Sequence, residues 1–265
     1  MRPTPPPGLK LPEYVVPRLG DRVGNVVDHG FGEGQLSLGW WNDELADLVK
    51  DGLPDVRVGV DPNENGSAKL TRGELFTLAK TLDSDANDAS VLFFLCHVFL
   101  WGSGMRPRNN RSRLRSFTGS DVTGRIGLLR EAALAAREGE RREAYSMLIR
   151  PGRAAIPYLG PAFYTKYLYF VSAEVSTNPC YILDARVAES LYDRGRGWSD
   201  ISRTPARRGQ GWNFSFNWYT DTYVGYCELL DRWALAASEQ IGVPVAADEI
   251  ERVLFDGPAP TTSTS

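Results

Sequence analysis

The sequence predicts a mainly α-helical protein, and three observations predict this fold class. Apolar residues recur at helical spacing in several segments, most clearly between Thr220 and Ile241. Residue types that cap helices, such as Thr71 and Asp184, stand ahead of some of these segments. Helical and strand-like runs do not alternate along the chain, as they would around a parallel sheet. We expect at most a minor strand, near residues 56–60.

Length and composition predict a folded body. The chain has 265 residues, of which 42% are hydrophobic and 11% are aromatic. These proportions allow a buried core and exclude intrinsic disorder for the body of the chain. The length suits one large domain or two small ones.

The chain opens with residues 1–35, which are rich in proline and glycine and predict an irregular N-terminal arm. The helical body follows over residues 36–257. Its first candidate helix lies within 36–52, after Asn42, where apolar residues recur at helical spacing.

The segment 71–82 opens with Thr71, and Glu74 follows at the spacing of a capping box. The segment 88–101 is apolar on almost every side, which predicts a central buried helix. Further helices are expected over 121–137, 141–149, 161–173, 184–191 and 220–241. We expect irregular chain over 151–160 and 195–215, and a disordered tail over 258–265.

Basic charge is concentrated in one part of the chain. The formal net charge is −3, yet residues 101–153 hold twelve arginines against five acidic residues. That segment carries +7 and the rest of the chain −10, which predicts a basic face. Two arginine-rich stretches beside glycines favour phosphate contacts over the alternative of solvated loops. The candidate contact residues are Arg106, Arg108, Arg111, Arg113, Arg203, Arg207 and Arg208.

The chain lacks the usual signs of a metal centre or a membrane span. Three cysteines without a CxxC pair and two histidines argue against cysteine-cage and polyhistidine metal sites. The longest apolar run, 91–101, is far shorter than the roughly 20 residues that a membrane helix needs. The N-terminus shows no secretory signal. We therefore expect a cytoplasmic monomer that uses no metal and no cofactor.

Lys166 is the candidate nucleophile. It is the last of only five lysines and lies among aromatic residues such as Phe163 and Tyr167. Such surroundings would desolvate the amine and favour its uncharged, nucleophilic form. Asp184, eighteen residues later, could accept the amine's proton or stabilise a developing cation. The alternatives are a lysine whose head reaches water and an aspartate that only caps the next helix.

The stretch from Leu159 to Leu191 resembles the helix-hairpin-helix DNA glycosylases of the 8-oxoguanine DNA glycosylase fold. In that family a Thr-Lys pair on a helix is followed about 19 residues later by a Val-Asp or Leu-Asp step. Thr165-Lys166 and Leu183-Asp184 match these two landmarks. The run Pro-Ala-Phe-Tyr-Thr-Lys is similar to the bacterial branch of the fold, some members of which are linked to phage defence.

The resemblance implies a helical glycosylase-like fold with a helix-hairpin-helix near residues 141–174, in which Gly160 contacts the DNA backbone. It implies a partner as well, namely double-stranded DNA that carries a modified base. The base would be flipped out and released by attack of Lys166 on the sugar C1′, assisted by Asp184. The hairpin departs from the family pattern, because Gly160 stands six residues before Lys166 and no second glycine follows it. The N-terminal sheet subdomain of the eukaryotic enzymes is not apparent.

A pocket for the flipped base requires flat π surfaces and polar groups. Two aromatic and amide-rich clusters offer them, and their alternative is a core anchor beneath a long loop. The candidate pocket residues are Trp40, Trp41, Trp212, Asn213, Asn217 and Trp218.

Several functions compete on this basis. The glycosylase hypothesis favours a hypermodified phage cytosine, such as glucosylated hydroxymethylcytosine, over 8-oxoguanine as the excised base, and strand cleavage by lyase chemistry is compatible with either. The second hypothesis is a non-catalytic protein that binds modified DNA. The third is a glycoside hydrolase that uses paired carboxylates, for example Asp221 and Glu228.

Overall fold

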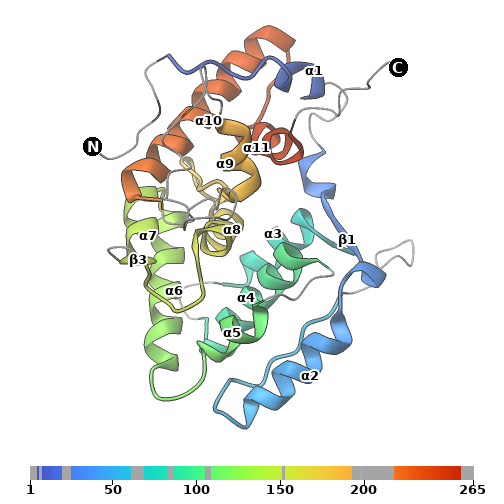
Figure 1. Ribbon diagram of the computed structural model, residues 1–265, viewed down its shortest axis with the longest axis vertical. Helices are drawn as coiled ribbons and strands as arrows, with labels where there is room; N and C mark the ends of the chain where they lie inside the picture. Colours follow the sequence, from blue (N-terminus) through green and yellow to red (C-terminus); the bar gives the residue numbers. More distant parts are fainter. Residues whose placement is uncertain are drawn as a thin grey trace, which may run out of the picture. The chain divides into compact units, whose positions relative to one another are not determined.

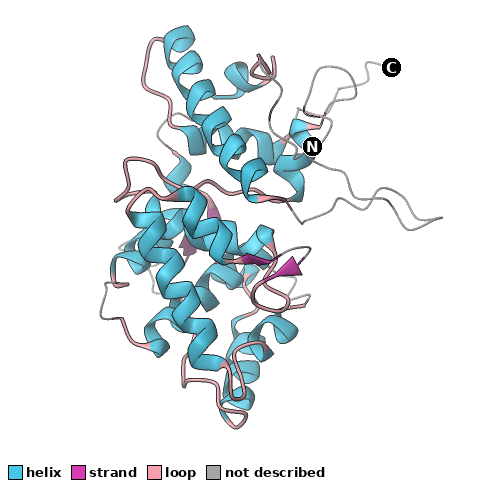
Figure 2. Cartoon of the chain, turned by 90° about the vertical axis from the view of Figure 1, so that its left-hand side faces the viewer, coloured by secondary structure: helices cyan, strands magenta, loops and turns pink. Residues whose placement is uncertain are grey.

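The computed structural model describes residues 5, 8–19, 25–60, 69–82, 86–104, 109–150, 153–192, 198 and 218–257. The chain divides into two compact units. The middle unit comprises residues 27–180, and the terminal unit comprises residues 1–26 together with residues 181–265. Helices form most of both units, as Figure 2 shows, so the mainly α prediction is confirmed.

The middle unit contains short 3-10 turns, seven α-helices and two small antiparallel strand pairs among its described residues (Figure 1). Its helical elements are η2 Val26–Asp28 at the unit boundary, η3 Glu33–Gln35, α2 Leu38–Val49, α3 Arg72–Lys80, α4 Asp88–Ser103, α5 Asn110–Arg115, α6 Val122–Arg137, α7 Arg141–Met147 and α8 Pro161–Ser172. Its strand pairs are β1 Gly30–Gly32 with β2 Lys69–Thr71, and β3 Ile149–Arg150 with β4 Arg153–Ala154.

The pairing of β1 with β2 depends on Gly30. This residue lies opposite Thr71 in the antiparallel register. A Cβ atom at Gly30 would lie 2.1 Å from the carbonyl oxygen of Leu70, so no other residue fits without moving the β2 backbone. The pairing brings the residue before β1, His29, beside the first residue of α3, Arg72, whose N–H donates to the His29 carbonyl at 3.0 Å.

Helices α4 and α8 form the core of the middle unit and both contact α3 and α6. Their inward faces are aromatic. The rings of Phe94 and Tyr167 lie 5.6 Å apart, and those of Phe76 and Tyr169 lie 5.4 Å apart. The buried Tyr167 hydroxyl donates to the carbonyl of Leu129 in α6 at 3.2 Å. The prediction of a central buried helix over 88–101 is therefore confirmed, and α8 shares that position.

The terminal unit contains α1 Val15–Leu19, α9 Ala185–Leu191, α10 Thr220–Ile241 and α11 Ala247–Asp256 within its described residues. Helix α11 contacts the other three. The hydroxyl of Tyr223 donates to the Tyr181 carbonyl at 2.9 Å, and that of Tyr226 donates to the Ile182 carbonyl at 2.6 Å. These bonds fix the chain before α9 onto the buried face of α10, whose apolar stripe is the one that the sequence predicts.

Some predicted elements differ in the structure. Residues 56–60 do not form a strand, so that prediction is wrong. The side-chain amide of Asn42 bonds to the backbone of Val58 in place of a neighbouring strand. Its oxygen accepts from the Val58 N–H at 2.9 Å, and its nitrogen donates to the Val58 carbonyl at 3.0 Å. Residues 1–35, expected to be irregular, hold α1, β1 and two 3-10 turns in their described part. The capping box at the start of α3 is confirmed, with Thr71 and Glu74 bonding reciprocally.

Candidate catalytic site

Lys166 lies in α8 with only 6% of its surface exposed. Its Nζ donates to the carbonyl of Ala162, one turn earlier, at 2.9 Å. Helix α8 starts at Pro161, after the N-cap Gly160. Proline suits this first helical position, because an N–H group there would have no partner within the helix. The other four lysines are all exposed: Lys10, Lys50, Lys69 and Lys80. Lys166 is thus the one buried amine among the five lysine side chains.

Gly102 in the last turn of α4 allows α8 to approach at the lysine. A Cβ atom on Gly102 would lie 3.2 Å from Cδ of Lys166 and 2.9 Å from Cε1 of Phe163. The absence of a side chain at Gly102 therefore leaves room for the lysine stem. Gly102 is not among the site residues predicted from the sequence, although a glycine inside an apolar helix is itself a signal of close approach.

Phe163 is shared by two cations. The Arg113 guanidinium carbon lies 3.8 Å from the ring centroid, and Nζ of Lys166 lies 5.8 Å from it. Arg113 also donates to Oδ1 of the fully buried Asn110 at 2.5 Å, and Asn110 in turn donates to Oγ of Ser103 at 2.9 Å. Burial lowers the pKa of Arg113 to about 10, which still leaves it charged near neutral pH. The surroundings of Lys166 are therefore cationic and aromatic.

A buried arginine lies close to the same end of α4. Arg72 is 1% exposed, and its guanidinium carbon lies 5.5 Å from the Trp101 ring centroid and 5.2 Å from that of Tyr169. Its Nη1 donates to the Tyr169 hydroxyl at 3.1 Å, and its Nε donates to Nδ1 of His29 at 3.3 Å. We call these four residues the Arg72 cluster. No sequence motif links them, because the pairing of β1 with β2 brings His29 to Arg72.

Asp184 is the N-cap of α9 and is 8% exposed. Its Oδ1 accepts from the N–H groups of Arg186 at 3.0 Å and Val187 at 3.2 Å. The capping alternative is therefore confirmed, while the catalytic role of Asp184 remains a prediction. Asp184 belongs to the terminal unit and Lys166 to the middle unit.

The candidate phosphate-contact residues have different surroundings. Arg111 is exposed on α5, and its Nε donates to both carboxylate oxygens of the buried Glu44 in α2, at 2.8 and 2.7 Å. This ion pair raises the pKa of Arg111 and holds α5 to α2. The Arg113 guanidinium lies over the Phe163 ring and donates to Oδ1 of Asn110. Five further candidates lie outside the described residues: Arg106, Arg108, Arg203, Arg207 and Arg208.

The candidate base-pocket residues are also divided. Trp41 is fully buried in α2, which supports the alternative of a core anchor, and its role in a base pocket stays a prediction. Trp40 is half-buried and contacts Trp41 edge to face, with ring centroids 5.3 Å apart. Trp218 is 3% exposed and belongs to the terminal unit. The other three candidates lie outside the described residues: Trp212, Asn213 and Asn217.

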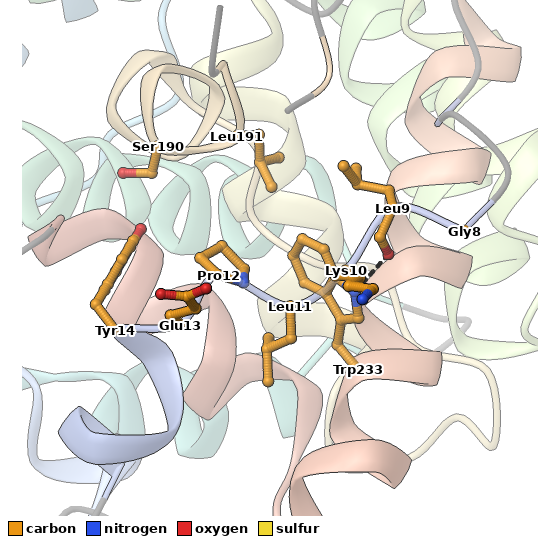
Figure 3. Close-up of a pocket in the computed structure, with 10 residues that line it drawn as sticks. All are labelled: Gly8, Leu9, Lys10, Leu11, Pro12, Glu13, Tyr14, Ser190, Leu191 and Trp233. Atoms are coloured by element: carbon orange, nitrogen blue, oxygen red, sulfur yellow. Dashed lines mark hydrogen bonds between the residues drawn. The ribbon is translucent and has the colours of Figure 1, made fainter. Parts of the chain in front are cut away.

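The terminal unit has a separate cavity of about 760 Å³, shown in Figure 3. The segment from Gly8 to Tyr14 lines it together with Ser190, Leu191 and Trp233. Nε1 of Trp233 donates to the carbonyl of Leu9 at 3.2 Å, which fixes this segment to α10. None of the lining residues that the structure describes was predicted from the sequence to be a site residue.

Across the described ranges, no cluster of three or more His, Cys, Asp or Glu side chains is arranged to hold a metal ion. In the same part of the chain, every helix is too short or too polar to cross a membrane. The glycoside hydrolase hypothesis requires two carboxylates that face each other across a cleft. Asp221 is half-buried in the first turn of α10, and Glu228 is exposed further along the same helix, so their positions do not support it.

Comparison with protein families matches residues 25–255 to the family described as "Putative 8-oxoguanine DNA glycosylase OGG-like protein". Searches of curated proteins and of solved structures each found no match. The family match covers both units, including Lys166 and Asp184. The chain therefore belongs to the OGG-like family, a family assigned to the DNA glycosylases.

Proposed function

We propose that this protein is a DNA glycosylase that excises a modified base with Lys166 as its nucleophile. One observation carries the proposal: Lys166 is the buried lysine, while the four others are exposed. Its stem lies in the space that Gly102 leaves open, and its Nζ lies over the Phe163 ring. A lysine amine held in this way is a group that can attack a sugar carbon and form a covalent intermediate.

The proposed reaction begins when DNA binding extrudes the modified nucleotide. The amine nitrogen of Lys166 forms a bond to C1′ while the C1′–N bond to the base breaks, and its electron pair leaves with the base. The attacking nitrogen then loses a proton, and the departing base is protonated. Opening of the sugar ring gives a Schiff base between Lys166 and C1′. Water releases this intermediate, or β-elimination first cleaves the strand on the 3′ side.

Asp184 would take the proton of the attacking amine or stabilise positive charge on the sugar. As the cap of α9, its Oδ1 already accepts from two backbone N–H groups. The helix-hairpin-helix near 141–174 is part of the same proposal. Helices α7 and α8 flank residues 148–160, which contain β3 and β4, and Gly160 stands at the start of α8.

Two modified bases are candidates for the substrate. The similarity of the Lys166 segment to the bacterial branch favours a hypermodified phage cytosine, such as glucosylated hydroxymethylcytosine, and a role in anti-phage defence. The description of the matched family favours 8-oxoguanine. The proposal covers both through the same lysine chemistry, and experiment separates them.

Borohydride trapping tests the proposal. The purified protein is incubated with duplex DNA that contains 8-oxoguanine and, separately, with DNA from a phage that glucosylates its cytosines. Lys166→Met keeps the length of the side chain and removes the amine, and Lys50→Ala removes an exposed lysine as the matched control. We expect a covalent adduct with one DNA for the wild type and Lys50→Ala, and none for Lys166→Met.

Other outcomes separate the competing functions. Release of a base without an adduct would mean that water, and not Lys166, attacks the sugar. Tight binding of one DNA without base release in any variant would identify a non-catalytic reader of modified DNA. Base release by Lys166→Met at the wild-type rate would refute the assignment of the nucleophile.

A further inference from the structure

Tyr158 is an exposed aromatic residue on a fixed turn just before α8. The residue is 66% exposed, although its neighbours in the turn, Ile156 and Leu159, are each 1% exposed. The Leu159 N–H donates to the Ile156 carbonyl at 3.2 Å. Oγ of Ser116, the C-cap of α5, donates to the Pro157 carbonyl at 2.7 Å. The turn is therefore anchored in the middle unit, while Tyr158 itself stays open to solvent.

The fold gives no reason for a tyrosine at this position. The φ angle of Tyr158 is 60°, in the left-handed region that suits glycine and strains a bulky residue. Within the part of the chain that the structure describes, its side chain makes no hydrogen bond, ion pair or ring contact. An exposed aromatic residue that is kept at a strained position without a partner in the fold indicates a partner outside it.

Arg115 brings a positive charge to the same turn. It is exposed in the last turn of α5, directly before Ser116, which holds the turn through the bond described above. Among the described residues its guanidinium has no carboxylate partner, whereas Arg111 in the same helix pairs with Glu44. Arg115 thus precedes the donor of that bond, and Tyr158 follows its acceptor. A π surface beside a cation suits nucleic acid, which offers base faces for stacking and phosphates for charge contacts.

The Lys166 amine lies at this end of α8 as well. Its Nζ bonds to the carbonyl of Ala162 in the first turn of the helix. Ala162 follows Tyr158 by four residues, so the Cα atoms of the two lie within about 15 Å of each other. Bases in one strand of DNA are stacked about 3.4 Å apart, so a nucleotide at Lys166 has its near neighbours within reach of Tyr158. Between them the surface is open at Gly160, where a Cβ atom would meet nothing within 4 Å.

We propose that Tyr158 stacks on a base that loses its neighbour when the modified nucleotide is extruded, and that Arg115 contacts a nearby phosphate. This inference rests on the proposed glycosylase function and extends it to the opening of the duplex. Extrusion breaks the stack and leaves a base face uncovered, which costs free energy. A ring on an anchored turn replaces the lost neighbour with little loss of conformational freedom. Tyr158 therefore favours extrusion and takes no part in the chemistry at C1′.

Binding to two duplexes tests this role. One duplex contains a tetrahydrofuran residue, an abasic analogue that leaves a gap in the stack and cannot react with an amine. The other has the same sequence and is fully paired. Tyr158→Gly removes the ring and suits the positive φ, so it should fold at least as well as the wild type, which thermal unfolding checks. Tyr158→Phe keeps the ring, and Leu235→Ala removes a similarly exposed apolar side chain from α10 as the matched control.

We expect Tyr158→Gly to weaken binding of the gapped duplex by about 5- to 150-fold, the usual effect of losing one stacked base, and binding of the paired duplex by less than about twofold. Tyr158→Phe and Leu235→Ala should bind both duplexes as the wild type does. Arg115→Ala should weaken binding of both duplexes by the same factor. It should also lower the slope of log affinity against log salt concentration by about one.

Three results would overturn the inference. The first is wild-type affinity of Tyr158→Gly for the gapped duplex. The second is an equal loss on both duplexes, because Tyr158 would then contact the backbone of any DNA. The third is a Tyr158→Phe variant as weak as Tyr158→Gly, because the hydroxyl and not the ring would then make the contact. An unchanged affinity and salt slope in Arg115→Ala would refute the phosphate contact.

Failure of the underlying glycosylase function gives a different pattern. In that case the wild type prefers the gapped duplex through Tyr158 but releases no base from either modified DNA. Base release by a wild type whose binding does not depend on Tyr158 would refute the stacking role alone. A wild type without any preference for the gapped duplex would overturn the inference whether or not it releases a base.

Discussion

Gly102→Ala should disturb Lys166 without unfolding the chain. The added Cβ atom would lie 2.9 Å from Cε1 of Phe163, whereas ordinary contacts begin at 3.4 Å, so the ring must move by about 0.5 Å. It would also lie 3.2 Å from Cδ of Lys166. Overpacking of this kind costs about 1–3 kcal/mol, while alanine in place of glycine in a helix returns at most about 1 kcal/mol.

Gly127→Ala in α6 is the matched control, because a Cβ atom there meets nothing within 4 Å. It should stabilise the protein by about 1 kcal/mol through helix propensity alone. The difference between the two variants isolates the packing at Lys166. We expect Gly102→Ala to be less stable than Gly127→Ala by about 1–3 kcal/mol, or roughly 2–4 °C in melting temperature for each kcal/mol.

The activity of the two variants should differ more than their stability. Displacement of a nucleophile by a fraction of an ångström can reduce a rate by about 10- to 100-fold. Single-turnover base release should therefore fall in Gly102→Ala and stay unchanged in Gly127→Ala. Equal melting temperatures and equal rates for the two variants would refute the tight approach of α4 to Lys166.

Three further predictions concern stability and reactivity. The three cysteines are buried and burial raises the pKa of Cys96, so none should react with iodoacetamide at pH 8 until denaturant is added, as mass spectrometry would show. Thr71→Ala removes the N-cap of α3 and should lower the free energy of unfolding by about 1 kcal/mol in a urea titration. Tyr226→Phe leaves the buried Ile182 carbonyl without its 2.6 Å donor and should cost about 1–3 kcal/mol, measured in the same way. A variant as stable as the wild type, or rapid labelling of the native protein, would contradict the corresponding prediction.

The segments with the strongest local signals were predicted correctly from the sequence. Helix α3 follows from its capping box, α4 from its unbroken apolar run, and α10 from its apolar stripe. Helices α5 and α11 were not expected. Helix α5 has six residues in an arginine-rich stretch, so its pattern resembles a solvated loop until Glu44 and Phe163 provide its partners.

The candidate nucleophile was also identified from the sequence, since Lys166 stands alone among aromatic residues. Only the tertiary structure decided which residues surround Lys166. Gly102 in α4 packs against the Lys166 stem, and Arg113 in α5 lies over the nearby Phe163 ring, because tertiary packing brings these separate segments to α8.

The same limit explains two features that the sequence did not reveal. The indole of Trp41 could stack on a base, but its burial depends on which face of α2 packs inward. Residues 56–60 have the alternation of a strand, but side chains bond to their backbone in place of a neighbouring strand, namely Asn42 at Val58 and His97 at Gly59. Local sequence thus determined helices such as α3, α4 and α10, because their caps and apolar patterns depend on residues close in the chain. Long-range packing decided which surfaces are buried and which side chains surround the Lys166 amine.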